Sequence, residues 1–243
     1  MEISNETKVK EIALSNPGAR QILEDAGVDY CCGGSKSLHE ACLHAEVAAE
    51  EILKRLRENK INVTPDEKVW ISSPLGDLNR HIRERHHRYV RAAIPRLRAL
   101  LAKVRGKHGE RHREIGEIAK LFREVGREMI AHMQKEEQIL FPYIEALERS
   151  ADGNGSVDPP FFQTVRNPVH AMMTEHDAVG DLIKQIHKAS DGYKAPADAC
   201  TSYQALYQGL RQFEVDLHQH LHLENNILFP RAVELEATVV GRT

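Results

Sequence analysis

The chain has 243 residues, of which 41% are hydrophobic, 28% are charged and 5% are aromatic, and its formal net charge is -3. This length allows one large core and a small additional domain, and the scarcity of aromatic residues favours a helical core of Leu, Ile and Val. The weak net charge excludes a strongly basic surface, so we expect no nucleic-acid partner. The sequence shows neither an apolar signal segment nor a stretch able to span a bilayer, which predicts a cytoplasmic protein with no membrane partner.

Residues 7–59 are predicted to form a first helical unit. Helices are expected at residues 9–14 and 19–23, on either side of an Asn-Pro-Gly sequence, and at residues 37–58. The Ala-Gly pair that follows the second of these is a typical helix C-cap.

Two adjacent cysteines, Cys31 and Cys32, precede Gly33 and Gly34 in the turn before the third helix. The glycines allow close approach to the backbone, and the helix N-terminus that follows favours a thiolate. In a cytoplasmic protein such thiols are expected to be reduced. We therefore interpret Cys31 and Cys32 as reactive thiols or soft-metal ligands, the alternative being two small buried residues before a turn. Cys42 is placed to support them, and Cys200 has no assigned role.

The second unit begins after a predicted linker and contains four helical patterns. Apolar residues recur along them at alternating spacings of three and four, which is typical of the seam of a helix bundle. The fold is therefore predicted to be all-α, an up-down-up-down four-helix bundle preceded by a small helical N-terminal domain. The predicted domains are residues 1–61, the linker 62–73 and the bundle 74–243; the predicted bundle helices span residues 74–104, 111–147 and 167–191, and a fourth begins near 196.

An eleven-residue segment occurs twice, as HMQKEEQILFP at residues 132–142 and as HLHLENNILFP at residues 220–230. Each copy places a His and a Glu four residues apart, on one face of a helix. Both pairs fall on the seams of their helices. The seam of the first bundle helix passes through His87, and that of the third passes through Met173 and His176. The spacing from His87 to His132 nearly equals that from His176 to His220, which indicates an internal duplication. Six residues should therefore meet in one layer of the bundle: His87, His132, Glu136, His176, His220 and Glu224.

A single His on an apolar face is more often an ordinary core residue than a ligand. Four imidazoles and two carboxylates in one layer are different, because buried ionised carboxylates repel each other and are costly unless paired. A pair of divalent metal ions removes this cost, and a donor set without thiolate favours iron, manganese or zinc. Two shared glutamates favour a dinuclear iron centre with open positions for dioxygen or nitric oxide.

The remaining histidines are interpreted as ordinary residues. His86 fits the seam less well than His87, and His218 and His222 are expected to point away from the ligand face. His108 is expected at the far end of the bundle. Glu175 either supports a ligand or lies on a solvated face.

The Cys-Cys-Gly-Gly motif followed by the two His-x-x-x-Glu-x-x-Ile-Leu-Phe-Pro repeats resembles the repair-of-iron-centres (RIC, YtfE/ScdA-type) family. The resemblance covers nearly the whole chain, with a ScdA-type N-terminal domain before a hemerythrin-like domain. It implies a non-haem di-iron protein of the response to nitrosative or oxidative stress, with damaged iron-sulfur proteins as clients. It also implies that the same six residues hold two iron ions, bridged by Glu136 and Glu224. Oxygen-carrying hemerythrins have a less symmetric ligand set, which argues against simple oxygen storage.

Three functions remain open from the sequence. In the first, the centre donates iron to damaged clusters, with Cys31 and Cys32 as iron-transfer residues. In the second, it reduces nitric oxide to nitrous oxide, and in the third, it binds oxygen or nitric oxide as a sensor. Iron donation is favoured over turnover catalysis, and the oligomeric state is left open, a homodimer included.

Overall fold

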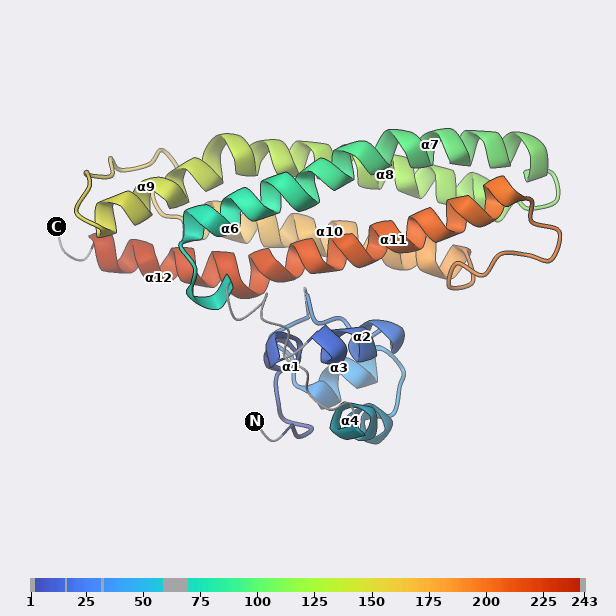
Figure 1. The fold of residues 1–243 in the computed structure, drawn as a ribbon, viewed down its shortest axis with the longest axis horizontal. Coiled ribbons are helices and arrows are strands. Elements are labelled where there is room, and N and C mark those ends of the chain that lie inside the picture. Colours follow the sequence, from blue (N-terminus) through green and yellow to red (C-terminus); the bar gives the residue numbers. More distant parts are fainter. Residues whose placement is uncertain (1–2, 16, 32, 59–69, 241–243) are drawn as a thin grey trace.

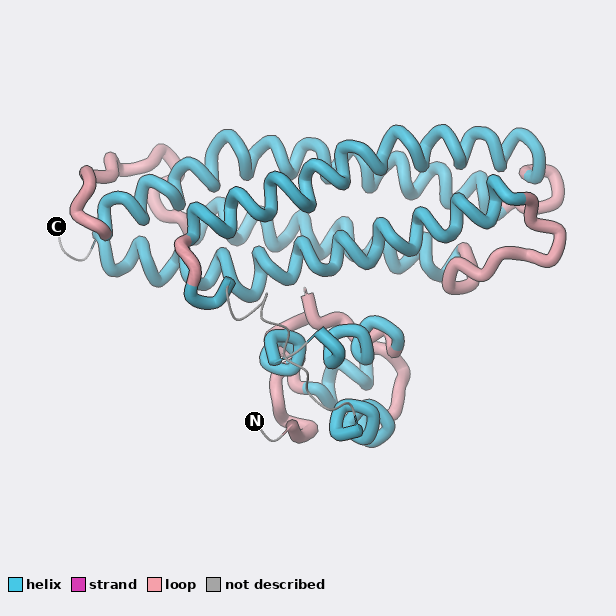
Figure 2. Tube along the Cα trace, in the orientation of Figure 1, coloured by secondary structure: helices cyan, strands magenta, loops and turns pink. Residues whose placement is uncertain are grey.

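The computed structural model describes residues 3–15, 17–31, 33–58 and 70–240. Within these ranges every regular element is a helix, and the helices form a small N-terminal unit and a long bundle (Figure 1; Figure 2). The prediction of an all-α fold is confirmed. Among the described residues, none of the helices combines the length and the apolar character needed to cross a membrane.

In the part of the chain that the structure describes, the N-terminal unit has four short helices packed around their own core of apolar residues. A capping box between Ser37 and Glu40 fixes the start of the third. The prediction of one helix over residues 37–58 is wrong, because Glu46 adopts a left-handed conformation (φ 57°). The amide of Val47 donates to the carbonyl of Cys42, which ends the helix in a Schellman motif. The four helices are α1 (Val9–Ser15), α2 (Pro17–Asp25), α3 (Leu38–His44) and α4 (Ala49–Glu58).

The bundle consists of four long rods in which sequential neighbours run antiparallel, as the up-down-up-down prediction requires (Figure 1). Three of the rods are interrupted by a π-helical segment (η). The first contains α6 (Leu75–His81), η1 (Ile82–His87) and α7 (Arg88–His108), and the second contains α8 (Glu114–Lys135), η2 (Glu136–Leu140) and α9 (Phe141–Ala151). The third is α10 (Arg166–Ala189), and the fourth contains α11 (Thr201–Leu223), η3 (Glu224–Leu228) and α12 (Phe229–Val240).

The π-helical segment η2 shifts the buried face of the second rod by one residue. The regular seam predicts that Ile139 is buried, but Ile139 is exposed and Leu140 is buried instead. A wide turn adds one residue to the helix before the pattern resumes. Pro142 follows closely, and since a proline has no amide hydrogen and its ring crowds the preceding turn, it favours such a departure from the regular ladder. The prediction that Met173 lies on the seam of the third rod is also wrong, because Met172 is buried there and Met173 is exposed.

The core of the bundle is divided into two apolar clusters. One, around Leu97, Phe122 and Phe213, fills the long part of the bundle, while the other, around Phe141 and Phe229, fills the end that holds α6, α9 and α12. The predicted His and Glu layer lies between the two clusters. Apolar packing on both sides therefore holds these polar side chains away from solvent.

The N-terminal unit contacts the bundle beside this layer. The side-chain amide of Asn226 donates to the carbonyl of Tyr30 at 3.2 Å, and Lys184 pairs with Asp29 at 3.3 Å. A Cβ added to Gly34 would lie 2.7 Å from Oδ1 of Asn226, so glycine is required for this close approach.

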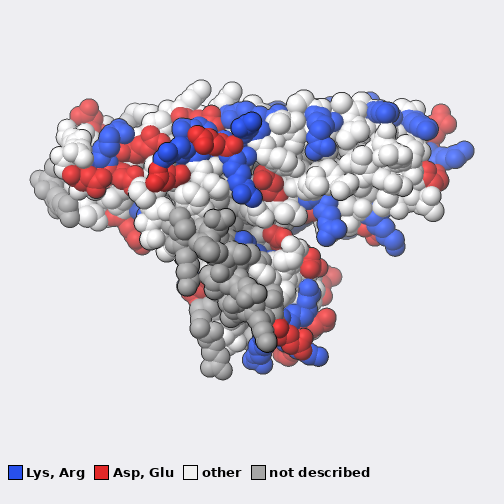
Figure 3. Space-filling view, viewed as in Figure 1, with Lys and Arg blue, Asp and Glu red and all other residues white. Residues whose placement is uncertain are grey.

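Most of the predicted linker lies outside the described residues, but its last part contacts the bundle. Arg231 of α12 donates hydrogen bonds to the carbonyls of Trp70 and Ser73. The division into residues 1–61, 62–73 and 74–243 stays a prediction. On the visible face of the molecule, basic and acidic side chains interleave (Figure 3), which accords with the small net charge.

Candidate metal centre

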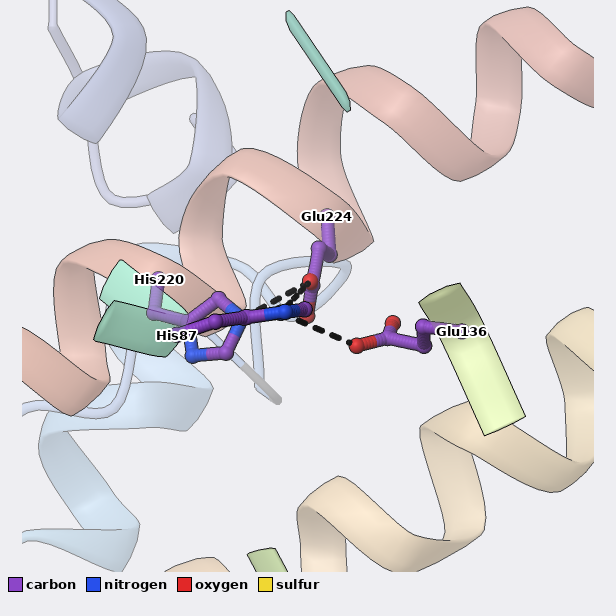
Figure 4. Close-up of side chains that lie close together, drawn as sticks. All are labelled: His87, Glu136, His220 and Glu224. Carbon is purple, nitrogen blue, oxygen red and sulfur yellow. Dashed lines mark hydrogen bonds and ion pairs between the residues drawn. The ribbon is translucent and has the colours of Figure 1, made fainter. Parts of the chain in front are cut away.

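The structure brings the six predicted ligand residues into one buried layer, and each of the six side chains is at most 1% exposed. They come from all four rods. His87 ends η1, while Glu136 and Glu224 begin η2 and η3. All three π-helical segments thus carry a residue of this layer, consistent with the tendency of such segments to occur at functional sites. The two carboxylates approach the imidazoles of His87 and His220 from different helices (Figure 4).

The first group consists of His87, His220 and the two glutamates, whose ligand-type atoms lie within 4.8 Å of one another. Nε2 of His220 lies 2.8 Å from Oε1 of Glu224. Nε2 of His87 lies 3.3 Å from Oε2 of Glu136 and 3.9 Å from Oε1 of Glu224.

The second group consists of His132, His176 and the same two glutamates. Nε2 of His132 lies 3.2 Å from Oε2 of Glu136, and Nε2 of His176 lies 3.2 Å from Oε2 of Glu224. Each carboxylate therefore contacts imidazoles of both groups. This is the arrangement expected of two metal positions that share two bridging carboxylates, each with two nitrogen ligands.

Three of the imidazoles are fixed from behind through their Nδ1 atoms. His87 contacts Glu137 at 2.6 Å, His132 contacts Glu175 at 3.0 Å, and His176 contacts Oδ1 of Asn225 at 2.8 Å. Because carboxylate and amide oxygens accept hydrogen bonds, each Nδ1 carries the proton, and in a neutral ring the lone pair lies on Nε2. Metal-binding histidines are commonly oriented in this way.

The residues present fit a pair of metal ions. If the imidazoles are neutral, the lone pairs of several Nε2 atoms face carboxylate oxygens or each other, and these groups repel. A cation between them would be attracted by all of these lone pairs and would remove the repulsion. Both oxygens of Glu136, Oε2 of Glu224 and Nε2 of His87 are buried and lack a hydrogen bond of good geometry from any described residue. Buried polar atoms are normally hydrogen-bonded, and a pair of bound ions would give these atoms the partners that they lack.

Without a metal, protons have to balance the two buried carboxylates. Burial and the neighbouring Glu224 would raise the pKa of Glu136, but the imidazoles of His132 and His87 outweigh them and keep it below its ordinary value. Burial lowers the pKa of His132, yet the charge of Glu136 and the hydrogen bond to Glu175 raise it overall to about 10. Ligand layers of this kind therefore take up either protons or metal ions.

Cys31 lies next to this centre, whereas Cys32 lies outside the described residues. Cys31 is 6% exposed, and its thiol donates to Oδ1 of Asp29 at 3.3 Å. Asn225, the residue that holds His176, also donates from Nδ2 to the carbonyl of Cys31 at 3.2 Å. One side chain thus connects the Cys31 loop to an imidazole of the metal layer. Cys42 is buried in the separate N-terminal core.

Several supporting residues were not identified from the sequence. Glu137 and Asn225 were missed, and Glu175 was left undecided, because a regular helical seam does not place them next to an imidazole. The sequence signal that could have found them is a Glu or Asn directly beside a His or Glu of the seam.

Two further histidines near the layer are buried as well. His86 is bonded to Asp216 at 3.1 Å and stacked on His220. His222 is buried beside Tyr30, so it packs between the bundle and the N-terminal unit.

Two domain families match the chain. Residues 78–232 match the hemerythrin HHE cation binding domain, and residues 5–60 match the ScdA_N domain, a domain of unknown function.

Curated relatives match over nearly the full length. A "Probable iron-sulfur cluster repair protein" of Haemophilus influenzae is 37% identical over 228 residues, which are 93% of this chain and 96% of the relative. Proteins named iron-sulfur cluster repair protein YtfE from Enterobacter sp. and Escherichia coli are each 35% identical over 223 residues, covering 92% of this chain and 94% of the relative.

Proposed function

The chain belongs to the hemerythrin HHE cation-binding family, and we propose that it repairs iron-sulfur clusters damaged by nitrosative or oxidative stress by donating iron from a two-iron centre. Support comes from relatives named for cluster repair, which match both the N-terminal unit and the bundle. The clients would be damaged iron-sulfur proteins. A cytosolic location and a homodimer stay predictions from the sequence.

The proposed iron ligands are the six residues of the buried layer. His87 and His220 would bind one iron, His132 and His176 the other, and Glu136 and Glu224 would bridge them. Imidazole nitrogens and carboxylate oxygens suit iron, and the absence of thiolate from the layer makes copper(I) or a cluster poor alternatives. When bound, the two irons would supply both the cargo for repair and positions for a small ligand such as nitric oxide or dioxygen.

The single observation that carries iron donation is the double contact of Asn225. Its Oδ1 accepts from Nδ1 of His176 at 2.8 Å, and its Nδ2 donates to the carbonyl of Cys31 at 3.2 Å. One side chain thereby links the backbone of the thiol-bearing loop to an imidazole of the second ligand group. Once the Cys31 thiol, which donates to Asp29, loses its proton, its sulfur would offer a soft ligand for an iron ion that leaves the layer.

A cavity provides an approach to this loop. It has a volume of about 510 Å³ and is lined by Tyr30, Cys31, Lys184 and His218, among other residues of the N-terminal unit and the bundle. A segment of a client protein inserted there would reach Cys31 without opening the apolar core. The residues of this chain would then hold the iron, present the thiol and keep bulk water from the centre.

The experiment compares the iron-loaded full chain with a Cys31→Ser, Cys32→Ser double variant and a Cys42→Ala control. A hydratase whose [4Fe-4S] cluster has been damaged with nitric oxide serves as the client, and its recovered activity is measured. Wild type and the Cys42→Ala control should restore it. The double variant should keep both irons and restore much less.

Two results would overturn this proposal. If iron-loaded wild type restores no client activity, the protein is not an iron donor. If the double variant loses the two-iron spectrum itself, the thiols are ligands of the centre and not transfer residues.

A second function is favoured by the composition of the two ligand groups. Each offers two nitrogens and two shared carboxylates. Iron commonly takes more ligands than this, so adjacent open positions would let two nitric oxide molecules bind side by side. Nitrous oxide released by the reduced protein with an electron donor would assign the centre to nitric oxide reduction, and its absence would exclude that activity.

A further inference from the structure

A second group of metal-binding side chains lies at the opposite end of the bundle. His108 is the last residue of α7, and His112 lies in the turn before α8. Asp198 and Cys200 lie in the loop that leads into α11. Ligand atoms of His108, His112 and Asp198 lie within 4.8 Å of one another. Since α7 is 21 residues long, this group lies roughly 31 Å from His87 at 1.5 Å per residue.

The four side chains approach one another in pairs. Nε2 of His108 lies 3.2 Å from Sγ of Cys200. Nε2 of His112 lies 2.9 Å from Oδ1 of Asp198 and 3.2 Å from Oδ2. Tetrahedral zinc with ligands at 2.0–2.3 Å separates pairs of ligand atoms by roughly 3.3–3.6 Å, so small side-chain movements of His108, His112 and Asp198 would admit the ion. Cys200 contacts His108 but lies outside the group whose ligand atoms are all within 4.8 Å of one another, so its thiol would have to turn toward the ion.

Glu114 orients His112 from behind. Its Oε1 lies 3.0 Å from Nδ1 of His112 and accepts a hydrogen bond at 3.0 Å from the hydroxyl of Tyr203. A carboxylate on Nδ1 leaves Nε2 to bind a metal, as in the carboxylate–histidine–zinc arrangement. Glu137 and Glu175 do the same for His87 and His132 in the buried layer.

Cys200 is the N-cap residue of α11. The backbone N–H groups of Tyr203 and Ser202 at this helix start lower the pKa of its thiol, which favours the thiolate that binds metal. The donor set is then two imidazole nitrogens, one carboxylate oxygen and one sulfur. This mixed set suits zinc, a borderline-soft ion, better than magnesium or calcium, which prefer oxygen ligands.

We propose that His108, His112, Asp198 and Cys200 bind a single zinc ion that joins the turn between α7 and α8 to the loop before α11. Four protein ligands leave no open position, which makes the ion structural and not catalytic. It would tie together the two connections at the end of the bundle opposite α9 and α12 (Figure 1). The proposal is independent of the iron centre, because it concerns different residues and a different ion.

The alternative is an ion-pair cluster without metal. In that case His112 is an imidazolium held between Asp198 and Glu114, both of which raise its pKa. The two states differ in their response to cobalt(II), which substitutes for zinc and gives a charge-transfer absorption only when a thiolate is a ligand. Cobalt binding is therefore the deciding measurement.

The test uses full-length protein already loaded with iron, so that the buried layer is filled. Wild type should retain about one zinc ion per chain in addition to iron. Replacement of that zinc with cobalt should give thiolate charge-transfer absorption. The Cys200→Ser variant should lose this absorption and keep its iron, whereas a Cys42→Ala control should behave as wild type. Serine is a good N-cap residue, so Cys200→Ser preserves the start of α11, which circular dichroism checks.

A Glu114→Gln variant tests the orienting carboxylate. Loss of a carboxylate behind a ligand His is expected to weaken zinc binding by about 10–100-fold, with unchanged iron content. Wild type that binds no zinc beyond its iron would overturn the proposal. So would a Cys200→Ser protein whose cobalt absorption equals that of wild type.

Discussion

Nε2 of His132 and Nε2 of His176 face each other at 2.9 Å in the middle of the bundle. Each ring is fixed from the other side through Nδ1, by Glu175 and Asn225. Two neutral rings held in this way would point two lone pairs at one position, which is unfavourable unless a proton or a cation lies between them. The pair therefore fits the proposed second metal position.

The neighbours Glu136 and Glu137 should differ sharply in their importance for iron. Glu136 contacts imidazoles of both ligand groups, whereas Glu137 contacts His87 only through Nδ1. Glu136→Gln should abolish the coupled two-iron signal. Glu137→Gln should weaken iron binding by about 10–100-fold and still reach two irons at saturation. Iron analysis and Mössbauer spectra measure both, and equal behaviour of the two variants would contradict the bridging role.

Asn225→Ala should weaken the iron centre and loosen the Cys31 loop together. Removal of the acceptor on Nδ1 of His176 is expected to lower metal affinity by about 10–100-fold. Asn226→Ala is the matched control, because Asn226 contacts Tyr30 and His222 but no proposed ligand. It should loosen the interface and leave iron affinity unchanged. Iron titration distinguishes the two, and an Asn225→Ala protein with wild-type affinity would exclude this coupling.

Gly34→Ala should disturb the contact between the N-terminal unit and the bundle. Its Cβ would lie 2.7 Å from Oδ1 of Asn226 and 2.9 Å from the carbonyl of Tyr30. Such crowding is expected to cost about 1–3 kcal/mol. Hydrogen exchange around Tyr30 and Cys31 should accelerate while iron content stays constant. Gly106→Ala, which would meet nothing within 4 Å in α7, should instead stabilise the protein by about 0.5–1 kcal/mol.

The metal-free protein should lose stability as pH rises, whereas the stability gained from iron should increase. Burial lowers the pKa of His87, but Glu136 and Glu224 raise it overall to about 9, and that of His132 rises to about 10, against an ordinary value of 6.5. Protonation of these rings therefore stabilises the metal-free fold fully below about pH 6.5, and this stability is lost as pH rises through about 9 to 10.

Iron binds the unprotonated imidazoles, so the stability gained from iron should increase over the same pH range. Thermal unfolding of both forms between about pH 6 and 9 measures this difference. If the gain in Tm from iron were constant across the range, protons and iron would not compete for the same layer.

Much of this architecture follows from the order of residues along each helix. Alternating spacings of three and four identify the bundle, and they place His87, His132, Glu136, His176, His220 and Glu224 in one layer because apolar neighbours on a seam must face the core. The His-x-x-x-Glu repeats needed no tertiary information, since residues four apart share a helix face. The break at Glu46 was missed, because the helix ends through a left-handed residue that is not glycine.

Other features depend on contacts between distant segments. The π-helical turns move the seam from Ile139 to Leu140, and no period of a regular helix predicts that step. Asn225 lies between His176 and Cys31, which are far apart in the sequence, and Cys200 meets His108 across 92 positions. Local spacing therefore determined which faces carry ligand residues. Only the packing of the rods and of the N-terminal unit decided which side chains support them, because hydrogen bonds between segments depend on distances that no single helix contains.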